Sequence, residues 1–261
     1  MGNRQHTNRN MRFGDVSFSV ASHTAWAPGI DTTAAWLEWA HDRKNTFAAS
    51  EPALKQMPPM LRRRASPSGK MALQAAYQCL PEQADVPIIF ASRHGECARS
   101  VELLLELAKH APLSPTSFSL SVHNANAGLL SIARGDRGNN IAIAAGPSTA
   151  EHALIEACGL LADGASQVLL VMSDSPPPEA FSAYQDCAEQ AYAWAWLLQA
   201  ADGDDQRERF SLSWSAAEAD DSAHKVSAPP GGLDILRFFL RRDAELARVA
   251  GGRRWRWSRH A

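Results

Sequence analysis

Two short apolar runs separated by an amphipathic segment constrain the fold of this chain more than any other feature. The runs, residues 140–145 and 167–172, have the length and composition of buried strands. Residues 149–163 between them repeat apolar side chains at helical spacing, and Gly164 follows as a helix-ending residue. Because parallel strands need a crossover connection of this kind, the pattern predicts a βαβ unit in a buried parallel sheet.

The rest of the chain extends this α/β pattern. Further strands are predicted at residues 16–20, 88–91, 210–214 and 253–259, and helices at 26–40, 69–80, 96–110, 191–201 and 233–240. Residues 1–10 are polar and predict a disordered leader, and residues 218–230 predict a polar loop. No repeat or clear boundary divides the remainder, so we expect a single domain over residues 11–261.

Periodicity also groups the apolar side chains. The groups are Trp36, Trp39 and Ala40; Val101, Leu104, Leu105 and Ala108; the core or interface residues Tyr192, Trp194 and Trp196; and the inward-facing Trp255 and Trp257. Arg254 and Arg256 alternate with the last two tryptophans. This spacing of two favours a terminal strand over a site for nucleic acid or membrane.

The composition excludes several function classes. The chain of 261 residues carries 26 Lys and Arg against 28 Asp and Glu, so its formal net charge of −2 provides no field that attracts nucleic acid or an anionic membrane. No apolar run approaches the roughly 18 residues of a membrane span, and the N-terminus lacks the apolar region of a signal peptide. We expect a cytoplasmic protein that binds no nucleic acid and does not span a membrane.

The cysteines argue against metal binding. Cys79, Cys97, Cys158 and Cys187 lie far apart, and the chain contains neither a CxxC pair nor an HExxH motif. In a reducing compartment they are expected to be buried or incidental thiols, and no metal site is predicted.

The turn Gly146-Pro147-Ser148-Thr149-Ala150, which joins a predicted strand to a predicted helix, nearly matches the G-x-S-x-G nucleophile elbow. A side chain here would lie at the carboxyl edge of the sheet, over the positive end of the helix dipole. Ser148 is therefore either an acyl-transfer nucleophile, as in a hydrolase or acyltransferase, or a helix-capping residue, as Thr149 could also be. The capping interpretation is favoured because no acid and histidine pair downstream is clearly placed at strand ends.

A longer match surrounds this turn. Its segments are Ser121–Gly128, Ser131–Ile132, Gly135–Gly138 and Ile141–Pro147. They resemble the β-ketoacyl-ACP synthases, in which N-x-x-A-G, S-I and G-x-x-G precede a strand that ends in the nucleophilic cysteine. The resemblance covers about residues 11–215. It implies a thiolase-like layered α/β fold, with helices on a mixed, largely parallel sheet, that corresponds to the N-terminal half of a ketosynthase with the second half missing or reduced.

The resemblance also implies a chain without the chemistry of that family. Pro147 stands where the family has its cysteine, and proline supplies neither a thiol nor a backbone N–H for the oxyanion. The family's H-G-T and N-x-x-x-G-H histidine motifs do not occur after Met172. The most similar string, His94-Gly95-Glu96, lies in the first half of the chain. We therefore expect no catalytic residue in this chain and no condensation by this chain alone.

Within the family, the chain resembles the chain-length-factor-like proteins of aryl polyene pathways, a type II polyketide system. This implies a heterodimer with a full-length β-ketoacyl-ACP synthase whose acyl tunnel this subunit would shape. The implied interface and tunnel residues are Thr116, Phe118, Ser121, His123, Asn124, Asn126 and Leu129. No cofactor of its own is implied, since the phosphopantetheine of an acyl carrier protein, bound by the partner, carries the acyl chain. The missing second half is expected to leave apolar faces uncovered.

Several residues keep two interpretations. Arg62, Arg63 and Arg64 form either a docking site for an acidic acyl carrier protein or a solvated basic turn. His123 and His152 flank the elbow, where histidines satisfied by the backbone are favoured over acid–base groups. A stand-alone acyl-binding protein is a further function class that the sequence leaves open.

Overall fold

The structure is a computed structural model that describes residues 14–42, 50–80, 85–201, 208–217 and 228–260. The predicted leader at residues 1–10 and most of the predicted loop at 218–230 lie outside these ranges. Within them, no helix has both the length and the apolar character that crossing a membrane requires.

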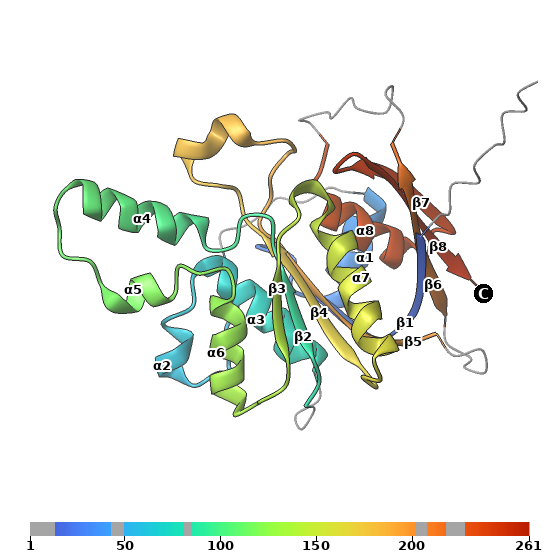
Figure 1. Cartoon of the computed structure of the whole chain (residues 1–261), viewed down its shortest axis with the longest axis horizontal. Coiled ribbons are helices and arrows are strands. Elements are labelled where there is room, and N and C mark those ends of the chain that lie inside the picture. The colour runs from blue at the N-terminus through green and yellow to red at the C-terminus, as the bar shows by residue number, and fades with distance from the viewer. Residues whose placement is uncertain (1–13, 43–49, 81–84, 202–207, 218–227, 261) are drawn as a thin grey trace, which may run out of the picture.

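The described strands form one eight-stranded mixed sheet in the order β3-β2-β4-β5-β1-β6-β8-β7 (Figure 1). The strands are β1 (Gly14–Trp26), β2 (Ile88–Ala91), β3 (Asn140–Ile143), β4 (Val168–Asp174), β5 (Tyr192–Ala200), β6 (Arg209–Ala216), β7 (Glu245–Ala250) and β8 (Arg253–His260). β2 pairs in parallel with β3 and β4, whereas the other five pairs are antiparallel. The mixed sheet is confirmed, but it is mostly antiparallel, because β5 follows β4 without a crossover helix.

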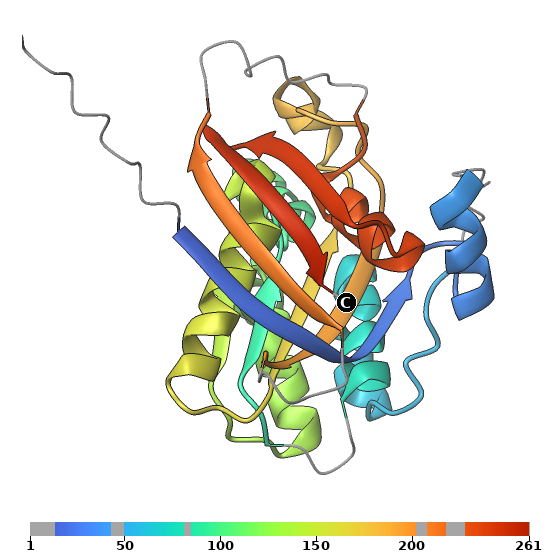
Figure 2. The ribbon, with the colours of Figure 1, turned by 90° about the vertical axis from the view of Figure 1, so that its right-hand side faces the viewer.

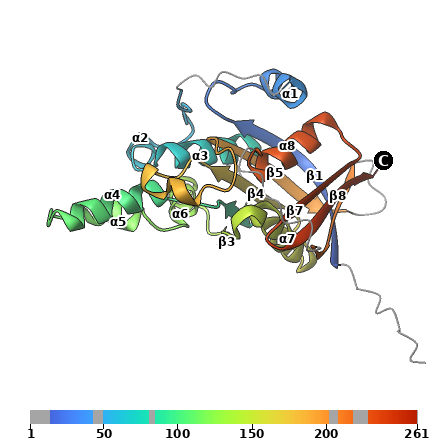
Figure 3. The ribbon, with the colours of Figure 1, turned by 90° about the horizontal axis from the view of Figure 1, so that it is seen from above.

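Helices cover both faces of the sheet (Figure 3). They are α1 (Thr33–Asp42), α2 (Pro59–Arg62), α3 (Pro67–Cys79), α4 (Cys97–Ala108), α5 (Pro115–Ser119), α6 (Ala125–Arg134), α7 (Thr149–Ala162) and α8 (Gly231–Arg241). α3 and α6 share one buried apolar cluster with β2, β4 and β5. α1, α7 and α8 share a second cluster on the opposite face. The sheet therefore separates two apolar cores.

The predicted βαβ unit is present as β3, α7 and β4, with β2 inserted between its two strands. β3 ends at Ile143 rather than at residue 145, because the chain turns at Gly146, whose φ of +56° lies in the left-handed region. Gly164 has a φ of +102° just after α7 and ends that helix as predicted.

The helix predicted at residues 191–201 is wrong, since this segment forms the central strand β5. Every residue from Tyr192 to Leu198 is buried, so both faces of the strand carry apolar side chains. Such a strand lacks the alternation that distinguishes a strand from a buried helix. Tyr192, Trp194 and Trp196 lie in the core, as predicted.

The helix predicted at residues 26–40 begins later than expected. β1 continues to Trp26, and Gly29, with a φ of +80°, lies in the turn that precedes α1. Only a few turn residues separate the strand from the helix, so their apolar side chains form one continuous pattern. The sequence therefore did not reveal the boundary between β1 and α1. Trp36 and Trp39 are nevertheless buried on one face of the helix, as predicted.

The C-terminal strands extend the sheet and share a buried cluster with α7 and α8. β6, β8 and β7 continue the sheet and curl around α7 and α8 (Figure 2). Trp255 and Trp257 point into this core, and the Trp255 ring lies 5.3 Å from the ring of His152 on α7. α7 and the sheet beside it are therefore not among the uncovered apolar faces that the sequence predicts. The exposed apolar surface lies elsewhere.

Candidate functional site

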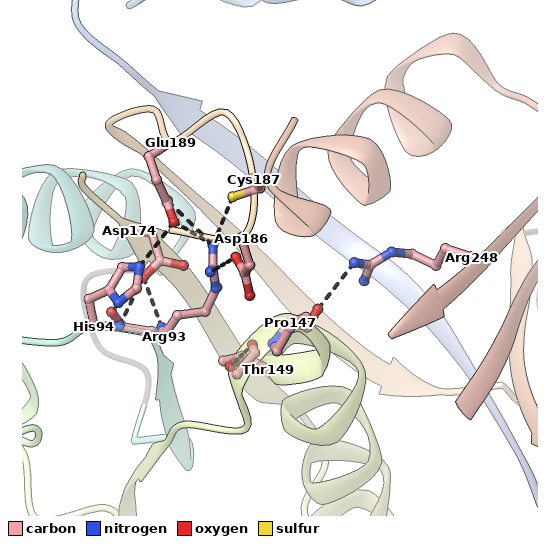
Figure 4. Close-up of polar contacts among 11 residues, drawn as sticks. Arg93, His94, Pro147, Thr149, Asp174, Asp186, Cys187, Glu189 and Arg248 are labelled. Atoms are coloured by element: carbon pink, nitrogen blue, oxygen red, sulfur yellow. Dashed lines mark hydrogen bonds and ion pairs between the residues drawn. The ribbon is translucent and has the colours of Figure 1, made fainter. Parts of the chain in front are cut away.

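The chain turns from β3 into α7 at the predicted elbow (Figure 4). A short 3-10 turn over Gly146–Ser148 leads directly into the helix. The Thr149 hydroxyl holds this turn, since it accepts from the Ala145 N–H at 2.9 Å and donates to the Gly146 carbonyl at 2.8 Å. Pro147 is tolerated because the first turn of a helix offers no acceptor for an N–H. Thr149 therefore holds the elbow with two side-chain hydrogen bonds, whereas Ser148, at the N-cap position of α7, makes no capping hydrogen bond with its side chain.

Ser148 lacks the surroundings of a nucleophile. Its side chain is buried, and its hydroxyl donates to the Ala145 carbonyl at 3.2 Å. Ring nitrogens of His152 and His123 contact the backbone carbonyls of Ser148 and Ile143 at 2.9 and 3.2 Å, which confirms histidines satisfied by the backbone. In the described part of the chain, no histidine nitrogen bonds the Ser148 hydroxyl, so no base is in place to activate it.

An arginine from the C-terminal segment occupies the space beside the elbow. Arg248 on β7 forms an ion pair with Glu151 on α7. It also donates to the Pro147 carbonyl at 3.1 Å (Figure 4). Glu151 is completely buried, and Gly231 leaves room for the guanidinium, since a Cβ there would lie 1.9 Å from Arg248. No local pattern in the sequence indicates this pair, whose members are 97 positions apart.

A second polar cluster lies at the carboxyl edge of β2 and β4 (Figure 4). Asp174, the last residue of β4, is completely buried and accepts hydrogen bonds from the Ser92 hydroxyl at 2.9 Å and the Arg93 N–H at 2.8 Å. Ser92 and Arg93 directly follow β2. Because β2 and β4 are parallel neighbours, their carboxyl ends bring these residues together.

The Arg93 guanidinium ties the loop between β4 and β5 to this edge. It forms ion pairs with Asp186 and with Glu189, the latter at 3.1 Å, and contacts the Cys187 sulfur at 3.1 Å (Figure 4). His94 Nε2 lies 3.3 Å from the same Glu189 carboxylate. The sequence indicated His94 only as part of a partial motif match and Cys187 only as an incidental thiol. No local pattern predicts that either residue contacts the same carboxylate network as Arg93.

Arg93 makes this cluster an ion network. Ligand atoms of Asp186, Cys187 and Glu189 lie within 4.8 Å of one another, a spacing that could hold a metal ion. Arg93 contacts all three groups, so its guanidinium already supplies the positive charge that a metal ion would bring. Burial raises the pKa of the Cys187 thiol to about 12, which keeps the sulfur protonated at neutral pH.

The buried Asp174 carboxyl makes the stability of the protein depend on pH. Burial raises its pKa to about 6, although His94 and Arg93 act to lower it. The fold therefore favours the protonated acid, and this contribution is lost as the pH rises from the ordinary pKa of 3.8 through 6. We expect the unfolding free energy of the wild type, relative to Asp174→Asn, to increase by about 2 kcal/mol from pH 7 to pH 4.5. Urea unfolding of both proteins measures this difference, and a decrease toward acid pH would show that Arg93 keeps the carboxyl ionised.

A pocket of about 510 Å³ opens on the surface beside α5 and α6. Its lining residues are Arg64, Pro115, Thr116, Ser119, Leu120, Val122, Asn124, Ala125, Gly128, Leu129 and Ile132. Thr116, Asn124 and Leu129 belong to the predicted tunnel set, whereas Arg64 belongs to the predicted docking set. The structure thus brings together residues for which the resemblance implied two separate roles.

The other residues predicted for the tunnel do not line this pocket. Ser121 donates to the Phe118 carbonyl at 2.8 Å, and Phe118 itself is 66% exposed. His123 faces the end of β3, and Asn126 donates to the Glu96 carboxylate at 3.2 Å. Their assignment to an interface stays a prediction.

The three arginines of the predicted docking site differ in their surroundings. The Arg62 guanidinium donates to the Ala53 carbonyl at 3.1 Å and so holds the chain's own backbone. Arg63 and Arg64 are exposed, and Arg64 lies at the pocket. A docking role is thus open to Arg63 and Arg64.

Exposed apolar side chains gather on the same part of the chain. The described residues include ten large apolar side chains that are exposed, and eight of them lie between residues 60 and 132: Met60, Leu104, Leu105, Leu107, Leu113, Phe118, Val122 and Ile132. Residues 97–119, which include α4 and α5, project from the body of the molecule, and we call them the arm (Figures 1 and 3). β3, at the end of the sheet, leaves one strand edge unpaired within the described chain.

Comparison with known proteins identifies this architecture. The family model of the β-ketoacyl synthase, N-terminal domain, matches residues 36–258. The match extends beyond residue 215, where the motif resemblance ended, and so includes the C-terminal strands. No curated protein sequence matches the chain.

Solved structures share the fold. A ketosynthase (ApeO) in complex with its chain length factor (ApeC) from Xenorhabdus doucetiae matches with a TM-score of 0.81 at 25% identity, covering 93% of this chain and 99% of the matched chain. The ishigamide ketosynthase/chain length factor matches with a TM-score of 0.71 at 12% identity, covering 94% and 99%. A β-ketoacyl synthase from Burkholderia phymatum STM815 matches with a TM-score of 0.57 at 11% identity, covering 79% of this chain and 66% of that chain. The fold is thus the thiolase-like ketosynthase fold, and it matches the N-terminal half of a ketosynthase.

Proposed function

Because this chain belongs to the β-ketoacyl synthase, N-terminal domain family, we propose that it is a non-catalytic chain length factor. It pairs with a full-length β-ketoacyl-ACP synthase and closes the far end of that partner's acyl tunnel, in polyketide or aryl polyene biosynthesis. The partner performs the condensation, and this subunit limits the number of extension rounds.

The elbow supports a non-catalytic role. Pro147, at the position of the family's cysteine, has no thiol to accept an acyl group and no N–H to stabilise an oxyanion. Arg248 is bonded to the Pro147 carbonyl and to the buried Glu151, so the space beside the elbow is filled. Pro147 therefore offers no nucleophile at this turn, and Arg248 occupies space beside it.

The similar structures support pairing with a ketosynthase. The chain matched in the complex of ApeO with ApeC is covered to 99%, so it is about as long as this one, whereas the match covers 66% of the Burkholderia synthase chain. A chain of this short length therefore has a counterpart within a complex of a ketosynthase and its chain length factor.

The observation that carries the proposal is the open pocket beside α5 and α6, which lies next to the exposed apolar side chains of the arm. Leu104, Leu105 and Leu107 on the arm are each more than half exposed, which is costly in a protein without a partner. A ketosynthase seated on the arm and on the free edge of β3 would bury these side chains. It would also cover the pocket, which would then form the closed end of a tunnel.

The free energies of acyl burial are large enough for this role. Burying one methylene group stabilises a bound chain by roughly 0.8 kcal/mol, whereas forcing one into a filled cavity costs about 1–3 kcal/mol. Since about 1.4 kcal/mol changes a rate tenfold, a few side chains in the pocket decide where elongation stops.

Gly128 provides the most direct test of the proposal. It lies within α6 and lines the pocket, and a Cβ there would meet no atom of this chain within 4 Å. A glycine inside a helix costs about 1 kcal/mol relative to alanine, yet the packing of this chain does not require it. We expect Gly128→Leu to fill the pocket and to shorten the main product by at least one extension round. Mass spectrometry of products from the complex with a co-expressed full-length synthase measures this shift.

Gly159 is the matched control, because it also lies inside a helix, α7, and its Cβ position is also open. Gly159→Leu should leave the product length unchanged. The proposal is wrong if no full-length synthase co-purifies with the chain, or if Gly128→Leu and Gly159→Leu give the same products.

The proposed complex also receives an acyl carrier protein, whose phosphopantetheine carries the growing chain into the partner's site. This chain needs no cofactor of its own for that role. Of the two exposed arginines, this proposal assigns Arg63 to the acidic carrier, because Arg64 lines the pocket and would be covered at the closed end of the acyl path.

A further inference from the structure

A buried carboxylate connects the helices behind the pocket. Glu96 is 6% exposed, and its Oε1 accepts hydrogen bonds from the Ser66 hydroxyl at 2.8 Å and from the Asn126 amide at 3.2 Å. The Arg99 Nε lies 3.6 Å from its other oxygen. A buried carboxylate with several donors and a cation holds its neighbours in one arrangement, because any lost partner leaves charge without compensation.

These contacts reach both walls of the pocket. Ser66 caps α3 through its hydrogen bond from the Gly69 N–H, and it lies two residues after the wall residue Arg64. Arg99 donates to the Arg64 carbonyl at 3.1 Å and so fixes the same wall from a second direction.

Asn126 fixes the opposite wall. It is on α6, next to the lining residue Ala125 and two positions before Gly128. Its side-chain oxygen packs against Gly69, where a Cβ would lie 2.3 Å away, so α3 and α6 approach closely at this point. Glu96 accepts the Asn126 amide and the Ser66 hydroxyl on the same oxygen, which sets the separation of the two walls.

We propose that Glu96 is a positioning residue, which sets the width of the pocket through Ser66, Arg99 and Asn126 and thereby sharpens the distribution of product lengths. This inference rests on the proposed function. Glu96 does not line the pocket and so acts only through the residues that it holds.

Isosteric charge changes test the inference in the purified complex with the synthase. Asn126→Asp should place two carboxylates against each other and push α6 away from α3, which should move or broaden the product distribution. Glu96→Gln should act in the same direction, since its oxygen would stay on Ser66 and Asn126 and its NH2 group would then face the Arg99 guanidinium. The double variant, Glu96→Gln with Asn126→Asp, re-forms an amide–carboxylate pair with reversed polarity and should restore the wild-type distribution.

Glu151→Gln is the matched control, because Glu151 is equally buried and arginine-paired but lies on α7, beside the elbow. It should lower the melting temperature and leave the product distribution unchanged. If Gly128→Leu shifts the products but the Glu96 and Asn126 variants do not, or if the double variant fails to restore them, the positioning role is wrong and the proposed function stands. If Gly128→Leu also has no effect, the proposed function itself fails.

Discussion

Replacing Leu104 and Leu105 with aspartate is expected to abolish stable pairing with a ketosynthase. The two side chains are 59% and 54% exposed on α4, so the substitution removes little packing within this chain, and its own stability should change little. In the proposed complex both positions are buried. Central apolar contacts contribute about 2 kcal/mol or more each, and unpaired carboxylates placed there add a desolvation cost, so the Kd should rise at least ~100-fold. Titration calorimetry with the purified synthase measures this change.

Leu37→Asp is the control for this experiment. Leu37 is also exposed, at 42%, but it lies on α1, outside the arm. Its replacement should leave the affinity unchanged. If the double arm variant bound the synthase as tightly as the wild type, the arm would not be the interface and the pocket beside it would not be covered.

The amphipathic pattern of residues 96–110 shows what periodicity can and cannot predict. It correctly indicated a helix with Leu104 and Leu105 on an apolar face, and α4 occupies residues 97–108. However, an apolar face only implies that something covers it, and the described part of this chain leaves Leu104 and Leu105 more than half exposed. A pattern that resembles a core helix can therefore mark an interface with another chain.

The backbone near the elbow was predictable because its signals are local. The apolar runs gave β3 and β4, Gly164 marked the end of α7, and the motif resemblance placed Pro147 at the turn. The segment at 191–201 failed for the opposite reason, because a strand buried on both faces has the composition of a buried helix.

The polar networks were not predictable, because they join residues that are distant in the sequence. Arg93 meets Glu189 across 96 positions and Arg248 meets Glu151 across 97. Neither pair has a characteristic spacing, and each forms only because the sheet brings the ends of its strands together. The same holds for Glu96, which the sequence indicated only as part of the His94-Gly95-Glu96 string. Its carboxylate contacts side chains at the start of α3, on α4 and on α6.

Glu151→Ala is expected to be the most destabilising single substitution considered for this protein. Glu151 is completely buried, and its removal would leave Arg248, which is only 14% exposed, without its carboxylate partner. Removing one member of a buried ion pair typically costs about 3–5 kcal/mol, because the remaining charge stays desolvated. Chemical denaturation should show this as a lower midpoint at an unchanged slope.

Two further variants separate the cost of the unpaired charge from simple loss of packing. Glu156→Ala, at an exposed position on the same helix, should change the unfolding free energy by only about 0.5 kcal/mol or less. Glu151→Leu combined with Arg248→Met removes both charges and should be more stable than Glu151→Ala alone, although it deletes more polar contacts. The double variant could instead be less stable than Glu151→Ala. In that case the attraction within the ion pair, and not the cost of an isolated charge, would hold the C-terminal strands against the elbow.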